Sequence, residues 1–386
     1  MSARKVILGQ PSWVASSRDV EIAVTTRGGH VAPVTFFRGS ARPVQPYYIS
    51  PWQGKGVRTG VPVLDVLRGD FFCMPFGADN RRGPEDHPIH GEPAGSPWRF
   101  DGLERKGGVT RLSLRMSTKT RPGRILKRLT LVDGHNVVYV EHELSGYDGP
   151  LCLSHHATLA VPEEPESVRV TASPMRFGQV APRASLTNDG NEYYALAPGR
   201  RFSSLRKVPT IWKDLPWADC GSHPHRRGYM DVIAVFPRTG SLPAWTAVTV
   251  PSEGYLWFAL RDARLLPQTV FWMDNGGRHA PPWSGINRCL GVEDGCAYFA
   301  SGLAQSARRN DLNRAGIPTV MRFRPGRMVR IAHIQGVARI PSSFDRVKAA
   351  SFRKDSIRFS SPSGKSVEAA VSWDFLREDF AGFQAR

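Results

Sequence analysis

The sequence lacks most features that mark secreted, metal-binding or membrane proteins. Its five cysteines are an odd number, are widely spaced and form no CxxC pair. This pattern argues against a disulfide framework and a zinc site, and it favours reduced, mostly buried thiols. No apolar run approaches the roughly 18 residues of a transmembrane helix. Residues 1–10 have an apolar core too short for a signal peptide. We therefore expect a cytoplasmic protein without a membrane partner.

Acidic residues are scarce relative to basic ones: 34 Asp and Glu stand against 52 Lys and Arg, a net charge of +18. The basic residues are scattered, with small clusters at residues 200–207 and 322–330, and no nucleic-acid-binding motif is present. The second cluster alternates with apolar residues, as on the solvent face of a strand. A solvated surface is the leading interpretation. An anionic sugar or polysaccharide is the alternative, and we expect no nucleic-acid partner.

Several catalytic signatures are also missing. The chain has no Ser-His-Asp order, no glycine-rich phosphate loop and no dinucleotide-binding fingerprint. No set of His, Asp or Glu has metal-ligand spacing. The Gly276-Gly277 pair is better explained by a turn that requires positive φ. We therefore expect neither a metal nor a cofactor.

Strand periodicity dominates what is present. Alternating apolar and polar residues recur between Gly, Pro and Asp turns, and Asp133-Gly134 is a strong hairpin signal. One helix is expected at residues 303–314. Strands are expected at residues 20–26, 30–37, 108–118, 124–132, 136–145, 151–161, 168–172, 177–180, 192–196, 230–236, 244–250, 255–260, 269–273, 321–334 and 356–373.

This pattern predicts an all-β fold, a large antiparallel β-sandwich with few short helices. The chain has no Gly/Ser-rich or charged linker, no low-complexity segment and no repeat. We therefore expect a single domain over residues 1–386. Residues 1–60 would supply N-terminal strands and a loop, and residues 61–386 would form the main sandwich.

One carboxylate stands out because it follows a strand that looks buried. Residues 269–273 form an apolar run that ends in a polar, glycine-rich turn, and a second apolar run then places Glu293 between Val292 and Asp294. A lone acid close to Asp, Asn, Arg, His and Trp side chains is typical of a sugar pocket with a general base. A solvated strand end is the alternative interpretation.

Three histidines and one more acid are further candidates. His90 lies in a polar loop, and loops carry function more often than strands do. His155 and His156 form a pair on a strand, where one buried and one exposed ring would be the structural explanation. Asp231 lies within an apolar strand, and an unpaired buried charge is costly. A salt bridge to an arginine would satisfy it as well as a sugar would.

Five segments, in order and rough spacing, resemble those of aldose 1-epimerases and related galactose mutarotase-like proteins. They lie between residues 77 and 300 and comprise Asn80-Arg81 with His90-Gly91 and Trp98, residues 153–159 with His155-His156, Asp231 in its strand, residues 268–275, and Leu290-Gly-Val-Glu293.

The resemblance implies a galactose mutarotase-like β-supersandwich with a carbohydrate pocket and an aldose 1-epimerase-type activity that needs no cofactor. It implies Glu293 as base, His156 (or His155) as acid and His90 as an assistant at the ring oxygen. One sugar ring must touch all three, so Glu293 should lie within about 8 Å of a histidine. The substrate-binding residues would be Asn80, Arg81, Asp231, His155, Trp98, Trp272 and Asp274.

The chain departs from the family pattern at two places. Phe271-Trp272-Met273 replaces Tyr-Thr-Gly, and Asp294-Gly295 replaces Pro-Gln. The turn at residues 274–279 is interpreted as the rim that selects the sugar. The expected partner is a small carbohydrate, neutral or anionic. Alternative functions are a non-catalytic carbohydrate-binding or accessory module, and other acid–base chemistry on a sugar, such as hydrolysis or elimination.

Overall fold

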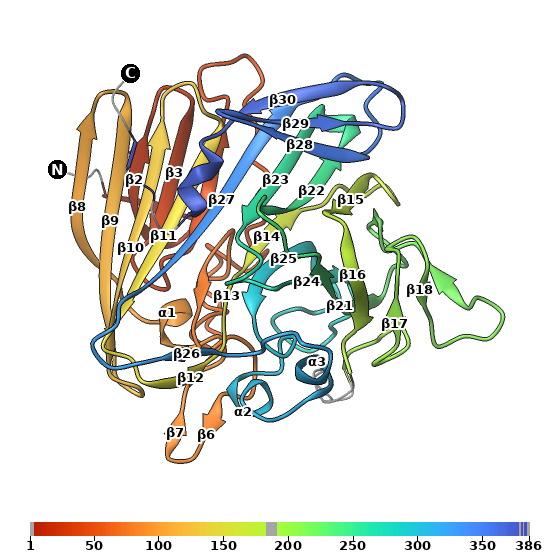
Figure 1. The fold of residues 1–386 in the computed structure, drawn as a ribbon, viewed down its shortest axis with the longest axis horizontal. Coiled ribbons are helices and arrows are strands. Elements are labelled where there is room, and N and C mark those ends of the chain that lie inside the picture. Colours follow the sequence, from red (N-terminus) through yellow and green to blue (C-terminus); the bar gives the residue numbers. More distant parts are fainter. Residues whose placement is uncertain (1–3, 183–190, 378–379, 381, 384–386) are drawn as a thin grey trace.

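Two large antiparallel β-sheets face each other in the computed structural model, which describes residues 4–182, 191–377, 380, 382 and 383 (Figure 1). Residues 1–3, which open the segment weighed as a signal peptide, lie outside that part. The first sheet has nine strands in the order β20 (Ser222–His223), β15 (Val168–Ala172), β22 (Ala244–Val250), β23 (Tyr255–Arg261), β27 (Val329–Arg339), β11 (Val137–Ser145), β10 (Gly123–Val132), β9 (Val109–Thr118) and β8 (Arg99–Lys106).

The second sheet has eight strands. Its order is β17 (Arg201–Phe202), β16 (Met175–Val180), β21 (Tyr229–Pro237), β24 (Gln268–Asn275), β25 (Arg288–Cys296), β13 (Leu153–His155) and β5 (Phe72–Cys73), while β14 (Ala157–Ala160) also pairs with β25. Strand β25 therefore lies between β24 on one side and both β13 and β14 on the other.

Smaller elements complete the fold. A four-stranded sheet contains β1 (Arg4–Ile7), β2 (Gln10–Ser16), β3 (Val20–Thr25) and β4 (Val31–Phe36). A three-stranded sheet contains β28 (Ala349–Arg353), β29 (Ser356–Ser360) and β30 (Ser366–Ala370). Strand pairs are β6 (Arg81–Arg82) with β7 (Glu85–Asp86), β12 (Gly149–Leu151) with β26 (Met321–Phe323), and β18 (Val208–Pro209) with β19 (Trp217–Ala218). The helices are α1 (Glu92–Gly95), α2 (Leu303–Ser306), α3 (Asp311–Arg314), η2 (Pro251–Glu253) and η3 (Trp373–Leu376).

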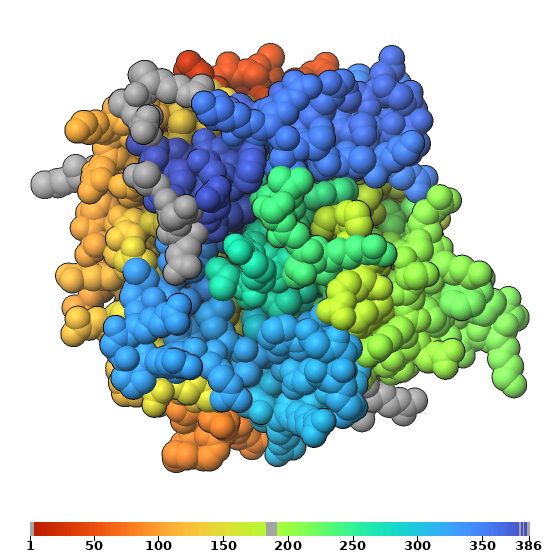
Figure 2. Space-filling view, viewed as in Figure 1, coloured from red at the N-terminus to blue at the C-terminus, as the bar shows by residue number. Residues whose placement is uncertain are grey.

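Period-two alternation decides which residues fill each layer of the core. On β23, Trp257 faces the second sheet, while Phe258 faces outward and packs against Phe359 of β29. Burial of such large apolar side chains is the main favourable term in folding. The three-stranded sheet thus covers the outer face of the nine-stranded sheet, and Figure 2 shows it in blue at the top of the molecule.

The predicted all-β sandwich is confirmed, and most predicted strands are present within a residue or two. Five predictions are wrong in detail. Residues 321–334 are divided between β26 and β27, and residues 356–373 between β29, β30 and the start of η3. The expected helix at residues 303–314 is two short helices, because the Asn310 side chain caps α3 and begins a new helix. Residues 151–161 break into three strands, and residues 192–196 form only isolated bridges.

Other expectations concern the cysteines, one glycine pair and membrane-spanning helices. All five cysteines are free and buried, as predicted. Gly276 has a φ of +80°, which confirms the predicted turn, whereas Gly277 is needed because a Cβ would lie 2.1 Å from the backbone nitrogen of Met230. No helix of the described residues is long and apolar enough to cross a membrane. A single domain over residues 1–386 stays a prediction.

Candidate functional site

The register of β25 brings Glu293 and His156 together. Gly295 pairs with Ser154 and Val292 pairs with Ala157, so Glu293 lies opposite His156, on the same face of the sheet. His156 Nε2 is 3.2 Å from Glu293 Oε1. This satisfies the expectation that Glu293 lies near a histidine. Neighbouring positions point the other way, because side chains alternate along a strand.

The Glu293 carboxyl is buried, and burial raises its pKa to about 8 against the opposing charge of Arg278. Burial, with His90 nearby, lowers the pKa of His156 well below its usual range. At neutral pH the pair therefore holds one proton, mostly on the carboxyl. Gly291 leaves room for this carboxyl, since a Cβ there would lie 2.7 Å from Glu293 Oε1.

His90 approaches the same point from a loop. Its φ is +60°, and Gly91 follows with a φ of +77°. Only glycine fits at the second position, because a Cβ would lie 2.1 Å from the carbonyl oxygen of Met74. The His90 ring lies 5.1 Å from the His156 ring, edge to face. Burial lowers the pKa of His90 to about 3, so the ring is neutral.

Phe71 fixes the plane of the His156 ring. The two rings stack at 4.4 Å and 19°, and the opposite face of Phe71 stacks on His30 at 4.1 Å. Phe71 is thus held between two rings, and His156 Nδ1 also lies 3.4 Å from the Thr158 hydroxyl. His156 is therefore positioned by packing as well as by its strand.

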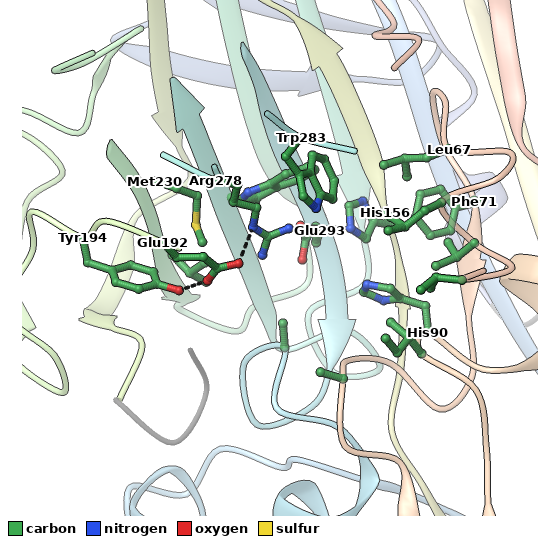
Figure 3. Close-up of a pocket in the computed structure, with 18 residues that line it drawn as sticks. Leu67, Phe71, His90, His156, Glu192, Tyr194, Met230, Arg278, Trp283 and Glu293 are labelled. Atoms are coloured by element: carbon green, nitrogen blue, oxygen red, sulfur yellow. Dashed lines mark hydrogen bonds and ion pairs between the residues drawn. The ribbon is translucent and has the colours of Figure 1, made fainter. Parts of the chain in front are cut away.

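These groups line a cavity of about 240 Å³ on the face of the second sheet that points away from the nine-stranded sheet (Figure 3). Its walls are mostly apolar, and its polar groups are few. The apolar lining comprises Val61, Val63, Leu64, Leu67, Phe71, Ala78, Ile89, Met230, Val232, Trp272, Trp283 and Ala300.

Arg278 lies across the cavity from His156 (Figure 3). Its Nε is 2.9 Å from Glu192 Oε1, and the Tyr194 hydroxyl donates to the same carboxylate. The guanidinium lies over two indole rings, 5.2 Å from the centre of Trp272 and 4.9 Å from that of Trp283. The positive charge is thus balanced by one carboxylate and two π faces.

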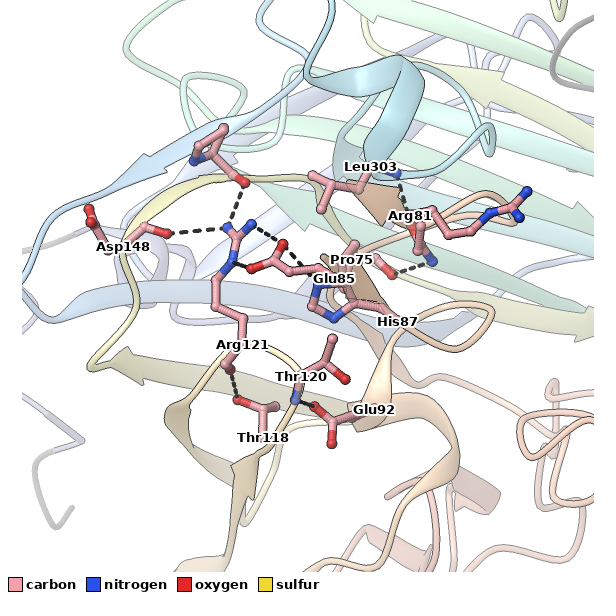
Figure 4. Close-up of polar contacts among 12 residues, drawn as sticks. Pro75, Arg81, Glu85, His87, Glu92, Thr118, Thr120, Arg121, Asp148 and Leu303 are labelled. Atoms are coloured by element: carbon pink, nitrogen blue, oxygen red, sulfur yellow. Dashed lines mark hydrogen bonds and ion pairs between the residues drawn. The ribbon is translucent and has the colours of Figure 1, made fainter. Parts of the chain in front are cut away.

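The structure places Asn80 and Arg81 away from this cavity. Asn80 is buried, where its amide donates to the carbonyls of Gly77 and Pro88 and its oxygen accepts from the backbone of Leu303. Arg81 is exposed and pairs with Asp79 at 3.4 Å. Figure 4 shows Arg81 pointing away from the other contacts of this loop. Neither residue lines the cavity, and Asn80 helps to hold the loop that carries His90. A role of Asn80 and Arg81 in substrate binding stays a prediction.

Loop residues beside His90 are tied to distant parts of the chain. Glu85 pairs with Arg121 on the far side of the loop (Figure 4), and Glu92 accepts from the backbone of Lys119 and Thr120. Charge-assisted hydrogen bonds of this kind are the strong ones. The loop that presents His90 is therefore anchored at both ends.

Because side chains alternate along a strand, two of the predicted site residues point away from the cavity. His155 lies between the two large sheets, where its Nδ1 is 3.2 Å from Asp70 and its ring stacks on His333 at 4.3 Å. Asp231 lies between Met230 and Val232, which line the cavity, so its carboxylate points to the reverse face. Of the His155-His156 pair, His156 alone faces the cavity.

The remaining predicted residues divide in the same way. Trp272 lines the cavity, and its indole nitrogen is buried without a hydrogen-bond partner among the described residues. Trp98 is buried elsewhere and donates to the carbonyl of Pro93. Asp274 supports the turn, accepting from Gly277 N and Asn287 Nδ2. The turn places Arg278 in the lining of the cavity.

Behind Glu293 the inter-sheet face carries a buried polar cluster. Asp294 contacts Arg261 Nη1 at 2.8 Å, His333 Nε2 at 2.8 Å and Thr269 Oγ1 at 2.6 Å. Burial alone would raise the pKa of Asp294, but Arg261 and His333 hold it below its usual range. Consecutive positions on β25 thus carry a carboxyl that tends to be protonated and one that stays ionised.

Sequence reasoning did not name the polar or aromatic lining residues Arg278, Trp283, Glu192 and Tyr194, although Arg278 lies in the turn that was interpreted as the rim. They lie in turns and irregular segments where no periodicity assigns a direction to a side chain. The isolated bridge between Glu192 and Arg278 joins segments far apart in sequence. Within the described residues, no group of three or more His, Cys, Asp or Glu could hold a metal ion.

Comparison with solved structures identifies the fold. A candidate aldose 1-epimerase from Klebsiella pneumoniae subsp. pneumoniae MGH 78578 aligns over 86% of this chain and 82% of its own, with a TM-score of 0.61 and 16% identity. A galactose mutarotase-like protein from Clostridium acetobutylicum aligns over 88% and 99%, with a TM-score of 0.59 and 10% identity. A candidate mutarotase from Salmonella typhimurium aligns over 88% and 94%, with a TM-score of 0.57 and 13% identity.

The chain therefore has the galactose mutarotase-like fold, and the resemblance drawn from the five sequence segments is confirmed at that level. No protein-family model matches the sequence, and no curated protein sequence matches it either. Fold alone does not assign an activity, because one fold hosts many functions.

Proposed function

We propose that this protein interconverts the anomers of a reducing sugar, as an aldose 1-epimerase does. The observation that carries the proposal is the contact of Glu293 with His156 inside a cavity that also holds His90. Ring opening requires a proton to leave the C1 hydroxyl and another to reach the ring oxygen. A carboxylate and an imidazole with shifted pKa values suit these two transfers.

The proton on the Glu293–His156 pair balances this reaction. Its transfer from carboxyl to imidazole gives the form in which Glu293 accepts the C1 proton and His156 donates to the ring oxygen. The open-chain sugar then leaves a neutral carboxyl and a neutral imidazole. Rotation about the C1–C2 bond and closure by the reverse transfers give the other anomer, so the pair ends with the proton it began with.

His90 and Arg278 would prepare the site for these transfers. The neutral His90 ring packs edge to face against His156 and would position or polarise the ring oxygen. Arg278 opposes the rise in the pKa of Glu293 and so favours its ionised form. Trp272 and Trp283 meet nearly at right angles at 5.5 Å, and one of these faces would stack on the C–H face of the sugar.

The test is NMR measurement of anomer exchange on neutral, acidic and phosphorylated aldoses. Wild type should exceed the buffer rate on at least one sugar, and Glu293→Gln should lose most of that acceleration with its fold intact. Arg81→Ala is the matched control. The sequence resemblance predicts that it impairs substrate binding, whereas its exposed position predicts unchanged activity.

Two other functions would give distinct results. If neither wild type nor variant exceeds the buffer rate, but glycan arrays show binding, the chain is a non-catalytic carbohydrate-binding module. Hydrolysis or elimination by the same Glu293 and His156 would appear in the spectra as new products. An anionic sugar would have to compete with Glu192 for Arg278, which the acidic and phosphorylated substrates test directly.

A further inference from the structure

A second cavity of about 200 Å³ lies on the reverse side of the strands that line the first. Its walls include β21, β24, β20 and the segment at residues 209–228. In Figure 2 the chain around this segment projects at the right of the molecule, in green. Its volume is close to the 240 Å³ of the first cavity, so it accommodates a ligand of similar size.

The two cavities lie back to back, because alternate residues of the same strands line them. Met230 and Val232 of β21 line the first cavity, and Asp231 between them lines the second. On β24, Trp272 lines the first and Met273 the second. The two cavities therefore share a wall but no lining residue.

Asp231 supplies a half-buried acceptor in this second cavity. Its Oδ1 accepts from the backbone nitrogens of Ala195 at 3.1 Å and Leu196 at 2.9 Å. Burial raises its pKa to about 6, and the two backbone N–H groups oppose that rise, so the group is mostly ionised at neutral pH. An ionised carboxylate offers about four lone-pair sites, and two backbone donors leave part of that capacity unused.

Two histidines add polar atoms without partners. His223 is completely buried, and neither ring nitrogen makes a hydrogen bond of normal geometry to a described residue, although the backbone of Cys289 lies nearby. His225 Nε2 also lacks a partner among the described residues. Buried polar groups are normally hydrogen-bonded, so this concentration at one cavity points to a missing ligand.

Charge and aromatic surface narrow the class of ligand. The Arg226 guanidinium lies 4.3 Å from the centre of the Trp212 ring and 5.7 Å from that of Tyr229. It already covers these aromatic faces with a cation. Asp219 has its own partner, Arg206, at 3.9 Å. The ionised Asp231 disfavours an acid, and Arg226 on the aromatic faces disfavours an amine, so an uncharged ligand with hydroxyl groups fits this cavity best.

The mouth of the cavity is apolar. Trp217 and Leu215, both lining residues, are 46% and 43% exposed, and neighbouring Ile211 is 54% exposed. Three exposed large apolar side chains within seven residues offer a surface for the C–H face of a ring. Polar groups at the bottom and apolar groups at the rim suit a molecule with hydroxyls on one edge and C–H groups on a face.

We propose that this second cavity binds one uncharged sugar ring or a polyol of the same size. Asp231 accepts hydrogen bonds from two adjacent hydroxyls, His223 and His225 pair with others, and Trp217 covers the ring face at the mouth. The inference rests on the second cavity alone and does not require catalysis in the first.

The experiment is ¹⁹F NMR of the protein labelled with 5-fluorotryptophan. Trp212 and Trp217 report on the second cavity, and Trp272 and Trp283 report on the first. D-galactose, D-glucose and myo-inositol are the probes, with choline and acetate as charged comparisons. At least one uncharged probe should shift the Trp212 or Trp217 resonance with a saturable dissociation constant.

Asp231→Asn should weaken that response by about ten- to a hundredfold, because a hydrogen bond to a charged acceptor is lost. The Trp272 resonance should stay in place and verify folding. Trp217→Ala, at an exposed position, is a second variant that should weaken the Trp212 response. The proposal is overturned if no uncharged probe shifts the Trp212 or Trp217 resonance, or if only choline or acetate does.

Discussion

Glu293 and His156 act as one titrating unit, because their side chains are in contact and together hold one proton near neutral pH. If the singly protonated pair is the active form, kcat/KM for anomer exchange should be flat through neutral pH. It should then fall as the pair loses its proton above pH of about 8. The check is a pH profile by NMR exchange spectroscopy, corrected for the buffer rate. A profile that rises through pH 8 would instead show that the fully deprotonated pair, and not the singly protonated one, is the active form.

The same pKa shift predicts a pH-dependent stability. The pKa of Glu293 is raised above its ordinary 4.5, so the protonated form favours folding and stability is lost as pH rises from there to about 8. Glu293→Gln removes that loss, so its free energy of unfolding relative to wild type should increase by a few kcal/mol between about pH 5 and 9. Urea unfolding at several pH values measures it. Glu104→Gln, at an exposed pair with Arg111, should show no such trend.

The place of a single residue could be predicted where strand alternation sets the direction of its side chain and where a purely structural explanation for it was weak. Glu293, His156 and Trp272 were assigned to a site and lie in the cavity. Asn80 and Asp231 were assigned by resemblance and lie elsewhere. Residue type and order do not specify whether a loop amide faces its own backbone or the solvent. Neighbouring side chains on a strand point to opposite faces of the sheet, and Asp231 therefore faces away from the cavity that Met230 lines.

Strand β25 is the element on which the site depends, because it carries opposite chemistry on its two faces. Glu293 faces the cavity, and Asp294 anchors the strand to Arg261 and His333 of the facing sheet. A shift of β25 by one residue relative to its neighbouring strands would therefore turn Asp294 toward the cavity and Glu293 toward the facing sheet. The apolar run at residues 289–294 indicated that Glu293 lies on a strand, whereas the partners that face this strand come from segments too distant for sequence periodicity to pair.

Gly291 gives a test at this scale. A Cβ there would lie 2.7 Å from Glu293 Oε1 and 3.0 Å from Trp272 Cβ, while the backbone conformation itself tolerates alanine. Gly291→Ala should therefore displace the carboxyl and lower kcat for anomer exchange by about a hundredfold, since misplacement near 1 Å costs that much. Gly102→Ala, in β8 with open space around it, is the matched control. Equal activity in the two variants would mean that the position of the Glu293 carboxyl does not limit the reaction.

At the scale of the whole molecule, a regular sheet supplies the acid and base, and irregular segments supply the remaining walls. Residues 61–71, 78–90, 192–194 and 278–283 converge on one face of the second sheet. Their turns have no periodicity, so the fold could be predicted but the lining of the cavity could not. The apolar wall in particular follows from how these segments meet.

That wall leads to a prediction about the substrate. Residues 61–71 and Ile89 place aliphatic side chains where a hydroxyl would find no hydrogen-bond partner, and leaving a hydroxyl unpaired on burial costs free energy. A 6-deoxyhexose such as D-fucose should therefore have a higher kcat/KM than its parent D-galactose. The ratio should be at most about a hundredfold, because an apolar pocket rejects an added hydroxyl only weakly. Competition experiments with both sugars give it directly. Ile89→Ser, at a partly exposed position on this wall, should shrink the preference. Equal or better turnover of D-galactose by both proteins would mean that the sugar turns its polar edge away from this wall.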